Sequence, residues 1–360
     1  MRAAARQWKA LSSNVSTHSP LRYAVVGAGA FGRNHLRVVR ELEQDGEDVR
    51  LVAVVDCDQA AREAAREFGI PAFCSVEECL EATRVDAASI CTPTSAHAEA
   101  ALPLVDAGVD LLIEKPLASS LEDADRILAL AREKGRIIQT GHLERFNPAV
   151  AAAQKHLTKP MFFEAHRLSL FTPRSLDVDV VLDLMIHDLD IVLSLVTSPI
   201  REVRAVGLPV LSRNVDIANV RVEFANGCVA NFTASRVSTE RVRKLRFFQP
   251  HQYLSLDFAR QDLFMIDVSS AAKLDPAKIA AMAQKLQGTQ LPNGTPAPGM
   301  SLHRVSVEPG EPLRLEIASF LNAVRSQSCP VVSGDDGRRA LALALHIRSE
   351  MTEHARRAGL

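Results

Sequence analysis

The chain has 360 residues, of which 47% are hydrophobic and 24% are charged, and its formal charge at pH 7 is only −1. This composition is typical of a soluble globular protein, and the length predicts about two domains, each able to bury a core. The near-zero charge argues against nucleic acid as a partner, because nucleic-acid binding usually requires a strongly basic face.

Other classes are disfavoured by simple patterns. The six cysteines form no CxxC pair, so we expect no zinc or iron–sulfur site and no bound metal. No run of eighteen apolar residues is free of charge, so no membrane span is expected. No signal peptide is recognisable, and we therefore expect the protein in the reducing cytoplasm.

The first twenty residues differ in composition from the rest. They contain Arg2, Arg6 and Lys9 but no acidic residue, which faintly resembles an organelle transit peptide. Instead of a transit peptide, we expect residues 1–20 to be a disordered tail or to result from a misassigned start codon.

From Leu21 to about Thr140, short apolar runs alternate with helical patterns. Such alternation predicts a parallel sheet with helices on both faces. The predicted strands are Leu21–Val26, Arg50–Asp56, Asp86–Cys91, Asp110–Glu114 and Arg136–Thr140. The predicted helices are Phe31–Gln44, Gln59–Phe68, a short one opened by Ser75, Ser95–Ala107 and one from Ser119 to Lys134.

After about residue 150 longer strands follow one another, which predicts an α+β domain with an open, mainly antiparallel sheet. Asn226-Gly227 between two of these strands is the strongest hairpin signal in the chain. The predicted strands are Met161–Leu170, Ile200–Val210, Ile217–Phe224, Cys228–Val237, Lys244–Phe248 and Tyr253–Phe258. The predicted helices are Val178–Val196, Glu311–Gln327 and Asp335–Arg357, and Gly288–Met300 is predicted to be a mobile loop.

The run Gly27-Ala28-Gly29-Ala30-Phe31-Gly32 is a GxGxxG motif between a predicted strand and a predicted helix, which is the context of dinucleotide binding. Gly27 permits the tight turn, Gly29 lets a pyrophosphate approach the backbone, and Gly32 lets helix and strand pack closely. Ala30 and Phe31 open the helix whose free N–H groups would face the phosphates.

Asp56 ends the next strand, where a carboxylate can accept the ribose hydroxyls of adenosine. No Arg or Lys lies between Asp56 and Ala61, so a 2′-phosphate would meet uncompensated negative charge. The pattern therefore favours NAD over NADP.

Two further segments follow strands of the same sheet. Thr92 and Pro93 follow one strand, with His97 in the next helix, and Glu114-Lys115-Pro116 follows another. Because ligands of open parallel sheets bind outside the carboxyl ends of the strands, we expect both segments to border the cofactor crevice. A solvated ion pair in a loop is the alternative interpretation of Glu114 and Lys115.

Together GAGAFG, Asp56, CTPTSAH (Cys91–His97), EKP (Glu114–Pro116) and DLMIH (Asp183–His187) resemble the Gfo/Idh/MocA oxidoreductases, in the right order and over nearly the whole chain. The resemblance implies a Rossmann domain, placed here at 21–142, and a substrate and oligomerisation domain with an open sheet at 143–340. Residues 341–360 would add a C-terminal helix. The resemblance also implies that the nicotinamide lies where the two domains join and that the substrate is a secondary alcohol.

Asp183 and His187 are four residues apart and share one face of the predicted helix. That face forms a narrow acidic stripe with Asp179, Asp190 and Ser194 on an otherwise apolar helix, which favours a cleft over a solvated surface. We expect His187 to act as general base, Asp183 to orient it and favour its protonated form, and Lys115 to stabilise the alkoxide. Whether Lys115 or His187 carries the proton is left open.

The segment GHLERFNP (Gly141–Pro148) and the stretch Asp179–Asp190 resemble the branch that acts on nucleotide-linked amino sugars. This implies oxidation of the 3-hydroxyl of UDP-N-acetylglucosamine to a 3-keto sugar nucleotide, which a partner aminotransferase could aminate on a route to lipid A precursors. Arg145 is then a candidate for an anionic group and Asn147 for a sugar hydroxyl, beside Lys115, Asp183 and His187. With weaker support, the diphosphate would be contacted by His166, Arg167 and Arg174. The alternative interpretation of Gly141–Pro148 is a plain linker in which Asn147 caps the following helix.

Two other functions fit part of the pattern. A dehydrogenase of a free sugar, inositol or other polyol fits everything up to residue 140. A non-catalytic NAD-binding regulator would be expected to lack the lysine or the histidine. Because the strands 220–224 and 229–235 do not supply a clean polar face, we expect the sheet to be covered in a homodimer or homotetramer.

Overall fold

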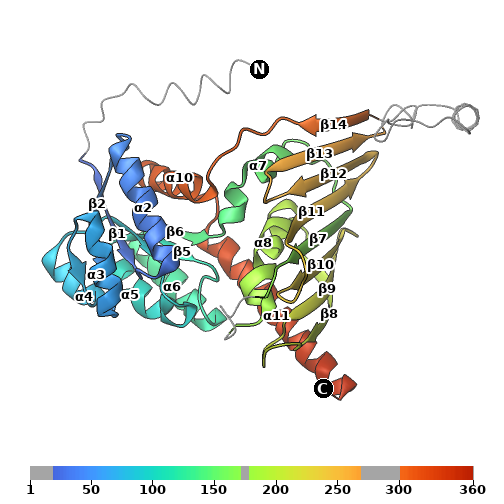
Figure 1. Cartoon of the computed structure of the whole chain (residues 1–360), viewed down its shortest axis with the longest axis horizontal. Helices are drawn as coiled ribbons and strands as arrows, with labels where there is room; N and C mark the ends of the chain where they lie inside the picture. Colours follow the sequence, from blue (N-terminus) through green and yellow to red (C-terminus); the bar gives the residue numbers. More distant parts are fainter. Residues whose placement is uncertain (1–18, 172–177, 269–300, 360) are drawn as a thin grey trace, which may run out of the picture. The chain divides into compact units, whose positions relative to one another are not determined.

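The computed structural model describes residues 19–171, 178–268 and 301–359. The chain divides into two compact units (Figure 1). Among the described residues, the first comprises 19–113, 129–138 and 317–330, and the second comprises 114–128, 139–171, 178–268, 301–316 and 331–359.

The first sheet has six strands in the order β3-β2-β1-β4-β5-β6, and the pairs from β3 to β5 are parallel. Its strands are β1 (Leu21–Val26), β2 (Val49–Val55), β3 (Ala72–Phe73), β4 (Ala87–Ile90), β5 (Asp110–Glu114) and β6 (Ile138–Gly141). The accompanying helices are α2 (Ala30–Gln44), α3 (Gln59–Ala65), α4 (Val76–Ala82), α5 (His97–Asp106) and α6 (Leu121–Lys134), with short 3₁₀ turns η1 (Arg66–Phe68) and η2 (Thr94–Ala96). The predicted Rossmann arrangement is confirmed.

Local signals explain several of these boundaries. The Ser75 hydroxyl accepts a hydrogen bond from Glu78 N, and Glu78 Oε2 accepts one from Cys74 N, so the predicted cap opens α4. The strands β1, β4 and β5 are almost wholly buried, as expected of a sheet covered on both faces. The short strand β3 was not predicted, because two residues give no periodic signal.

The second sheet has eight strands in the order β14-β13-β12-β11-β7-β10-β9-β8. All neighbours are antiparallel except β7 and β10, which are parallel. Its strands are β7 (Phe162–Leu168), β8 (Ile200–Leu208), β9 (Ile217–Phe224), β10 (Val229–Ser235), β11 (Val242–Gln249), β12 (Gln252–Asp257), β13 (Asp262–Asp267) and β14 (Ser301–Val305). This confirms the open, mainly antiparallel sheet.

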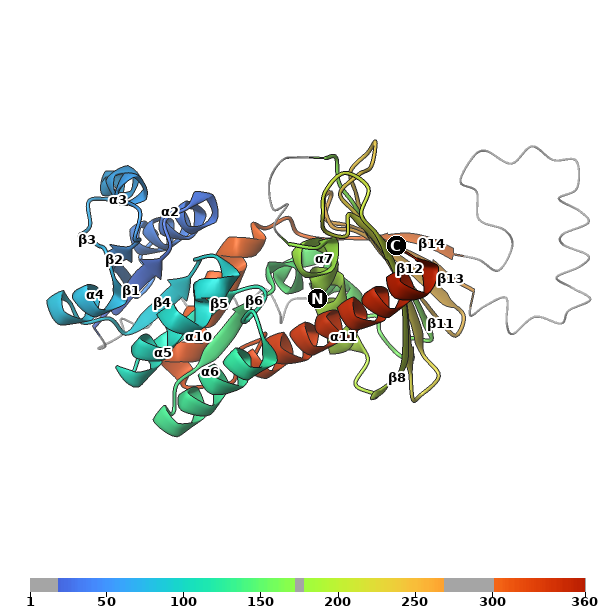
Figure 2. The same ribbon diagram turned by 90° about the horizontal axis from the view of Figure 1, so that it is seen from below.

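Helices cover one face of this sheet (Figure 2). They are α7 (Pro148–Gln154), α8 (Ile186–Leu195) and the long α11 (Gly334–Ala358), and the 3₁₀ turn η3 (Leu143–Phe146) precedes α7. Their apolar side chains and the inner face of the sheet form one core around the fully buried Phe163, Phe232 and Phe247. The remaining helix, α10 (Pro312–Ser326), confirms the prediction over Glu311–Gln327.

The outer face of β9 and β10 differs from expectation. Most side chains on that face are polar, with Asn219 Nδ2 donating to Thr233 Oγ1 at 2.9 Å and Arg221 donating to Asn231 at 3.3 Å, whereas Val229 also lies there. The inner positions carry Ala218, Val220, Val222 and Phe224. Inner and outer positions alternate in step with the pleat, so the outer face is more polar than expected, with Val229 as its apolar exception between 229 and 235.

The predicted helix Val178–Val196 begins later than expected. Residues Val181–Met185 form a π-helical turn, η4, and the regular α8 follows from Ile186 to Leu195. The strands β13 and β14 were not predicted. Among the described residues, no helix is long and apolar enough to cross a membrane. The expectations for residues 1–18, for Arg174 and for Gly288–Met300 lie outside the described residues.

Candidate active site

Lys115 directly follows β5, and its peptide bond to Pro116 is cis. Its ammonium Nζ donates a hydrogen bond of 2.8 Å to the backbone oxygen of Asp183 and lies 3.7 Å from Asp183 Oδ1. About a fifth of the Lys115 side chain stays exposed, at 20%. The fold thus brings together two predicted site residues that are 68 positions apart.

The environment of Lys115 makes its proton easier to remove. Burial lowers the pKa of Lys115, and the nearby carboxylates of Asp183 and Glu114 oppose that shift. Lys115 is therefore suited both to donate a hydrogen bond to a developing alkoxide and to exchange a proton.

Asp183 lies in the π-helical turn η4 and faces Lys115, not His187. Both its backbone oxygen and its carboxylate are directed to the lysine amine. Nδ1 of His187 has no hydrogen-bond partner among the described residues, and burial is the first cause that lowers the pKa of His187. The described residues show no hydrogen bond between Asp183 and His187 Nδ1, and the orientation of His187 by Asp183 stays a prediction.

The stripe predicted on this helix is divided among different partners. Asp179 Oδ1 accepts hydrogen bonds from the backbone N–H groups of Val181 and Leu182 and so caps the turn. Arg348 of α11 pairs with the other oxygen of Asp179 at 2.8 Å. Ser194 donates to the Ile191 carbonyl. Only part of the stripe therefore faces a site.

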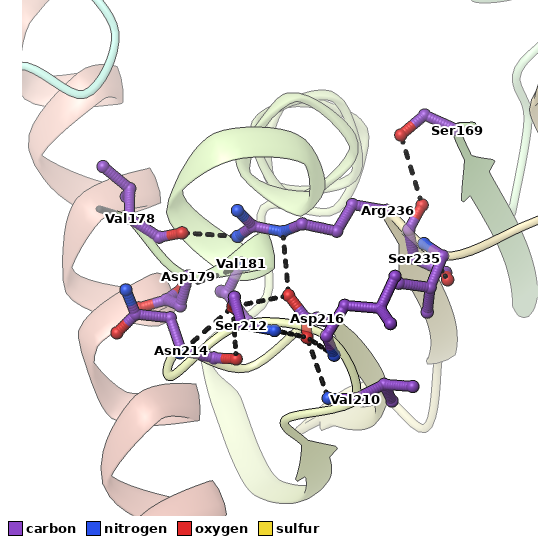
Figure 3. A network of polar contacts seen from close by, with 12 residues as sticks. Ser169, Val178, Asp179, Val181, Val210, Ser212, Asn214, Asp216, Ser235 and Arg236 are labelled. Atoms are coloured by element: carbon purple, nitrogen blue, oxygen red, sulfur yellow. Dashed lines mark hydrogen bonds and ion pairs between the residues drawn. The ribbon is translucent and has the colours of Figure 1, made fainter. Parts of the chain in front are cut away.

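A buried polar network holds the chain just before η4 (Figure 3). The Arg236 guanidinium donates to the carbonyl of Val178 and lies 3.6 Å from Asp216 Oδ1. Burial opposes ionisation of Asp216, but hydrogen bonds from Ser212 and from backbone N–H groups lower the pKa of Asp216 to about 2. This anchored carboxylate fixes Arg236, and Arg236 fixes the start of the turn that carries Asp183.

His187 lies on α8, four residues after Asp183, with its Nδ1 shielded from solvent and without a hydrogen-bond partner among the described residues. Burial lowers the pKa of His187 well below its ordinary value, and the charges of Lys115 and Arg167 add to the effect. The imidazole is therefore neutral at pH 7 and can accept a proton.

A second imidazole, His142, contacts the first. The two rings meet edge to face with centroids 6.3 Å apart and an interplanar angle of 88°. His142 is buried, and neither of its ring nitrogens has a hydrogen-bond partner in the described part of the chain. We did not single out His142 in the sequence, although it stands in GHLERFNP, because nothing there indicates that it meets α8.

The three basic and polar residues assigned to the substrate have other partners. Arg145 pairs with the buried Asp190 at 3.5 Å and donates to the Val331 carbonyl. Asn147 caps α7 through its oxygen, and its amide donates to Glu144 and to the Phe258 carbonyl.

Arg167 forms a bidentate pair with Asp188 and a further bond to Glu144, all in the core of the unit. These contacts occupy the polar groups of Asn147 and Arg167 within the fold, so neither side chain is assigned to the substrate in the proposal below. His166 lies on β7, and no side-chain hydrogen bond of His166 is found among the described residues. Arg145 remains a candidate for contacting the substrate, because its Nη1 has an ion-pair contact but no hydrogen bond in the described part of the chain.

The glycine loop has the geometry that a dinucleotide needs. Gly27 has a φ of +93°, and a side chain there would lie 2.7 Å from the backbone of Cys91. A Cβ at Gly32 would lie 1.8 Å from the Gly27 oxygen, whereas a Cβ at Gly29 would meet nothing within 4 Å. The space over Gly29 is therefore open, and Ala30 and Phe31 form the exposed first turn of α2.

The acidic residue after β2 supports this loop. Asp56 Oδ2 accepts a hydrogen bond from Ala28 N at 2.6 Å, and Oδ1 accepts one from Asp58 N. Each carboxylate oxygen has two lone pairs, so Asp56 can still accept ribose hydroxyls. The guanidinium of Arg62, one residue after the segment Asp56–Ala61, donates to the carbonyls of Asp56 and Cys57.

The remaining predicted cofactor residues lie at strand ends. His97 Nε2 is 3.1 Å from the carbonyl of Thr92, and the buried Thr92 hydroxyl has no hydrogen-bond partner among the described residues. Pro93 caps the short turn η2. Glu114 is buried at the end of β5, where a Cβ at Gly141 would lie 2.7 Å from its carboxylate. The unpartnered hydroxyl of Thr92 is available to hydrogen-bond a polar ligand.

Comparison with known proteins agrees with this geometry. Residues 21–142 match the model of the oxidoreductase family with an NAD-binding Rossmann fold, and residues 153–249 match the Gfo/Idh/MocA C-terminal domain. The chain belongs to the Gfo/Idh/MocA oxidoreductase family. As a member it is a dehydrogenase that acts on CH–OH groups, and its cofactor is NAD.

Individual members of the Gfo/Idh/MocA family are similar over most of their length. The UDP-N-acetylglucosamine 3-dehydrogenase of Acidithiobacillus ferrooxidans is 36% identical over 91% of this chain and 96% of its own. Its solved structure superposes with a TM-score of 0.80 over 92% of this chain and 98% of that one. The NAD-dependent scyllo-inositol 2-dehydrogenase of Bacillus subtilis is 31% identical over 61% of this chain and 68% of its own. Levoglucosan dehydrogenase with NADH shares the fold, at a TM-score of 0.79 and 17% identity over 93% of this chain and 98% of that one.

Proposed function

We propose that the protein oxidises the 3-hydroxyl of UDP-N-acetylglucosamine to the 3-keto sugar nucleotide. The observation that carries this proposal is the 36% identity with the Acidithiobacillus enzyme of that name, which extends through both compact units. The site residues Lys115, Asp183 and His187 supply the groups that such an oxidation needs.

Residues of the first unit would hold the cofactor. Gly27, Gly29 and Gly32 would admit the pyrophosphate, and Asp56 would accept the ribose hydroxyls. NAD, when bound, supplies the acceptor for the hydride that leaves the substrate carbon.

In the second unit, the neutral His187 takes the hydroxyl proton as general base, because burial keeps its imidazole unprotonated. The Lys115 ammonium donates a hydrogen bond to the same oxygen and stabilises its negative charge. Asp183 holds Lys115 through its carbonyl and so directs the amine. Lys115 as the proton carrier is the alternative, and its lowered pKa fits that role as well.

The substrate is tested by NADH formation. Purified protein and NAD are assayed with UDP-N-acetylglucosamine, other UDP-sugars, free sugars and myo-inositol. We expect the highest kcat/KM with UDP-N-acetylglucosamine. Turnover of inositol or a free sugar without turnover of any UDP-sugar would replace the proposal by a polyol or sugar dehydrogenase, which the similarity to the Bacillus enzyme favours as the second candidate.

The remaining assignments belong to the same proposal. A 3-keto sugar is a substrate for an aminotransferase, so an enzyme of that class would consume the product on a route to lipid A precursors. We further propose that the protein works in the cytoplasm as a homodimer or homotetramer. The presence of both Lys115 and His187 argues against a non-catalytic regulator.

A further inference from the structure

Arg243 is an exposed cation on the inner face of the second sheet. It lies on β11 directly opposite Arg167 of β7, and side chains of residues paired in this way project from the same face of a sheet. The following inner positions of β11 are the fully buried Leu245 and Phe247, whereas Arg243 itself is exposed. Within the part of the chain that the structure describes, the Arg243 side chain makes no hydrogen bond or ion pair.

The guanidinium opposite Arg243 is already occupied. Arg167 donates to both oxygens of Asp188 and to Glu144. Because two carboxylates face one guanidinium, balancing their surplus charge at a distance is one role that Arg243 could have. Yet Arg243 forms no ion pair with either carboxylate among the described residues, which leaves its guanidinium available to an anionic ligand.

The register of the strands places Arg243 at the end of the sheet from which the chain enters η4. The parallel strands β7 and β10 both finish at this end, and β11, antiparallel to β7, begins there. Directly after β10, Arg236 donates to the carbonyl of Val178 (Figure 3). Val178 leads into the turn that carries Asp183, whose carbonyl accepts the Lys115 amine.

A second contact connects this end of the sheet with α8. The two hydrogen bonds between Arg167 and Asp188 join β7 to the helix, and Asp188 is the residue directly after His187. The charge of Arg243 is also among those that lower the pKa of His187, after the larger effects of burial and Lys115. Arg243 therefore lies on the side of the unit that holds Lys115 and His187, but on a different element.

The proposed substrate requires a cationic group in such a position. In a sugar nucleotide the diphosphate is attached to C1 of the same ring whose 3-hydroxyl is oxidised. The group that binds the diphosphate must therefore be near the proton-transfer groups without occupying their place. A guanidinium is always charged and can donate two parallel N–H bonds to phosphate oxygens.

We propose that Arg243 binds the diphosphate of the sugar nucleotide, in the role that the sequence suggested for Arg167. This inference rests on the proposed function and deepens it, because it names the residue that distinguishes a nucleotide-linked sugar from a free sugar. A free sugar or inositol has no anionic group for Arg243 to bind. Since the diphosphate does not change during the oxidation, the interaction is equal in ground and transition states, and its loss raises KM without lowering kcat.

The subsite is tested by steady-state kinetics of wild type, Arg243→Gln and Arg246→Gln with saturating NAD and UDP-N-acetylglucosamine. Arg246 is the matched control because it lies on the same strand but on the outer face, where it pairs with Glu164 at 3.8 Å. We expect KM to rise about 10–100-fold in Arg243→Gln at unchanged kcat, and to stay at the wild-type value in Arg246→Gln.

Inhibition by UDP and by uridine gives a second readout on the same preparations. We expect UDP to inhibit Arg243→Gln more weakly than wild type by about the same factor as the change in KM. Uridine, which lacks phosphates, should inhibit both proteins equally. Arg243→Lys keeps the charge but not the planar fork, so it should weaken UDP inhibition less than Arg243→Gln does, and it replaces that variant if Arg243→Gln does not fold.

Unchanged KM and unchanged UDP inhibition in the Arg243 variants would overturn the subsite while the proposed function stands. A lowered melting temperature at unchanged KM would also overturn it and would assign Arg243 to the charge balance of Asp188 and Glu144. An equal rise of KM in Arg246→Gln would exclude a specific site at Arg243. A wild type that oxidises no UDP-sugar would overturn the proposed function and, with it, the subsite.

Discussion

The candidate active site depends on two side chains whose pKa values are both lowered by burial. His187 is neutral and Lys115 is held by the carbonyl of Asp183, so one group can accept a proton while the other donates a hydrogen bond. The two roles need opposite protonation states, which the same environment allows because the ordinary pKa values of histidine and lysine differ by about four units.

This predicts the pH dependence of kcat/KM. His187 must be neutral and its pKa is lowered, so the acid limb should lie below the ordinary histidine value of about 6.5. Lys115 must keep its proton and its pKa is also lowered, so the alkaline limb should lie below about 10.4. Initial rates measured across this range check both limbs, and an acid limb at or above 6.5 would exclude His187 as base.

A second prediction concerns Glu316 on α10, which is fully buried with no hydrogen bond to either carboxylate oxygen among the described residues. Burial, then Glu114 and Asp190, raise the pKa of Glu316 well above its ordinary value. Between the unfolded pKa of about 4.3 and the raised folded value, the unfolded state binds fewer protons, so stability falls as pH rises.

Glu316→Gln removes this titration. In urea denaturation we expect the free energy of unfolding of the variant minus that of wild type to be larger at about pH 8 than at about pH 5, because only wild type loses stability between the two. Glu311 is exposed and lies directly before α10, so Glu311→Gln is the control, and its offset from wild type should be the same at both pH values. An equal offset at both pH values would mean that Glu316 is ionised in the fold.

For single residues, the sequence predicted roles well where a motif determines the chemistry of the side chain. It misled where the side chain's contact partner comes from a distant segment of the chain. Lys115 and Asp183 do contact each other as members of recognisable motifs. Arg167, by contrast, is neutralised by Asp188 and Glu144, and no local pattern reveals that these three meet in the core. His142 was missed for the same reason.

Among the elements, the π-helical turn η4 most affects the site. A regular helix was predicted because apolar residues recur at helical spacing from Val178 onward. The wider turn cannot be read from that spacing, and Asp183, which contacts Lys115, lies within it. π-helical turns inside α-helices are often found at functional sites, and this one carries a candidate catalytic residue.

The glycine loop allows a matched pair of substitutions. Gly29 has extended backbone angles and open space where a Cβ would lie, so Gly29→Ala should keep the melting temperature and weaken NAD binding. Gly32→Ala would place a Cβ 1.8 Å from the Gly27 oxygen and should lower both stability and NAD affinity. Thermal melts and NAD titrations check this, and unchanged NAD affinity in Gly29→Ala would contradict the assigned phosphate site.

For the whole molecule, the sequence predicted the two sheet types but not the full order of strands. The central position of β7, parallel to β10 and antiparallel to β11, depends on pairing between residues far apart in the chain. The hairpin of β9 and β10 was predictable because Asn226-Gly227 joins them locally, with Gly227 at a φ of +83°.

Self-association is the prediction that belongs to this scale. The β9 and β10 surface is polar, but exposed apolar side chains remain on the strands β8, β13 and β14 at Val206, Leu208, Phe264 and Leu302. We expect light scattering to give two or four times the chain mass of 39.2 kDa. A monomer at micromolar concentration would contradict the proposed oligomer.

The central claim is that Lys115 and His187 together carry out the proton chemistry of an NAD-dependent alcohol oxidation. It is tested most directly by kcat for Lys115→Met and His187→Asn, with NAD affinity measured on the same preparations. We predict that kcat falls by about 10²–10⁴ in each variant while the NAD dissociation constant stays at the wild-type value. Two folded, NAD-binding variants that keep kcat within about threefold of wild type would contradict the account.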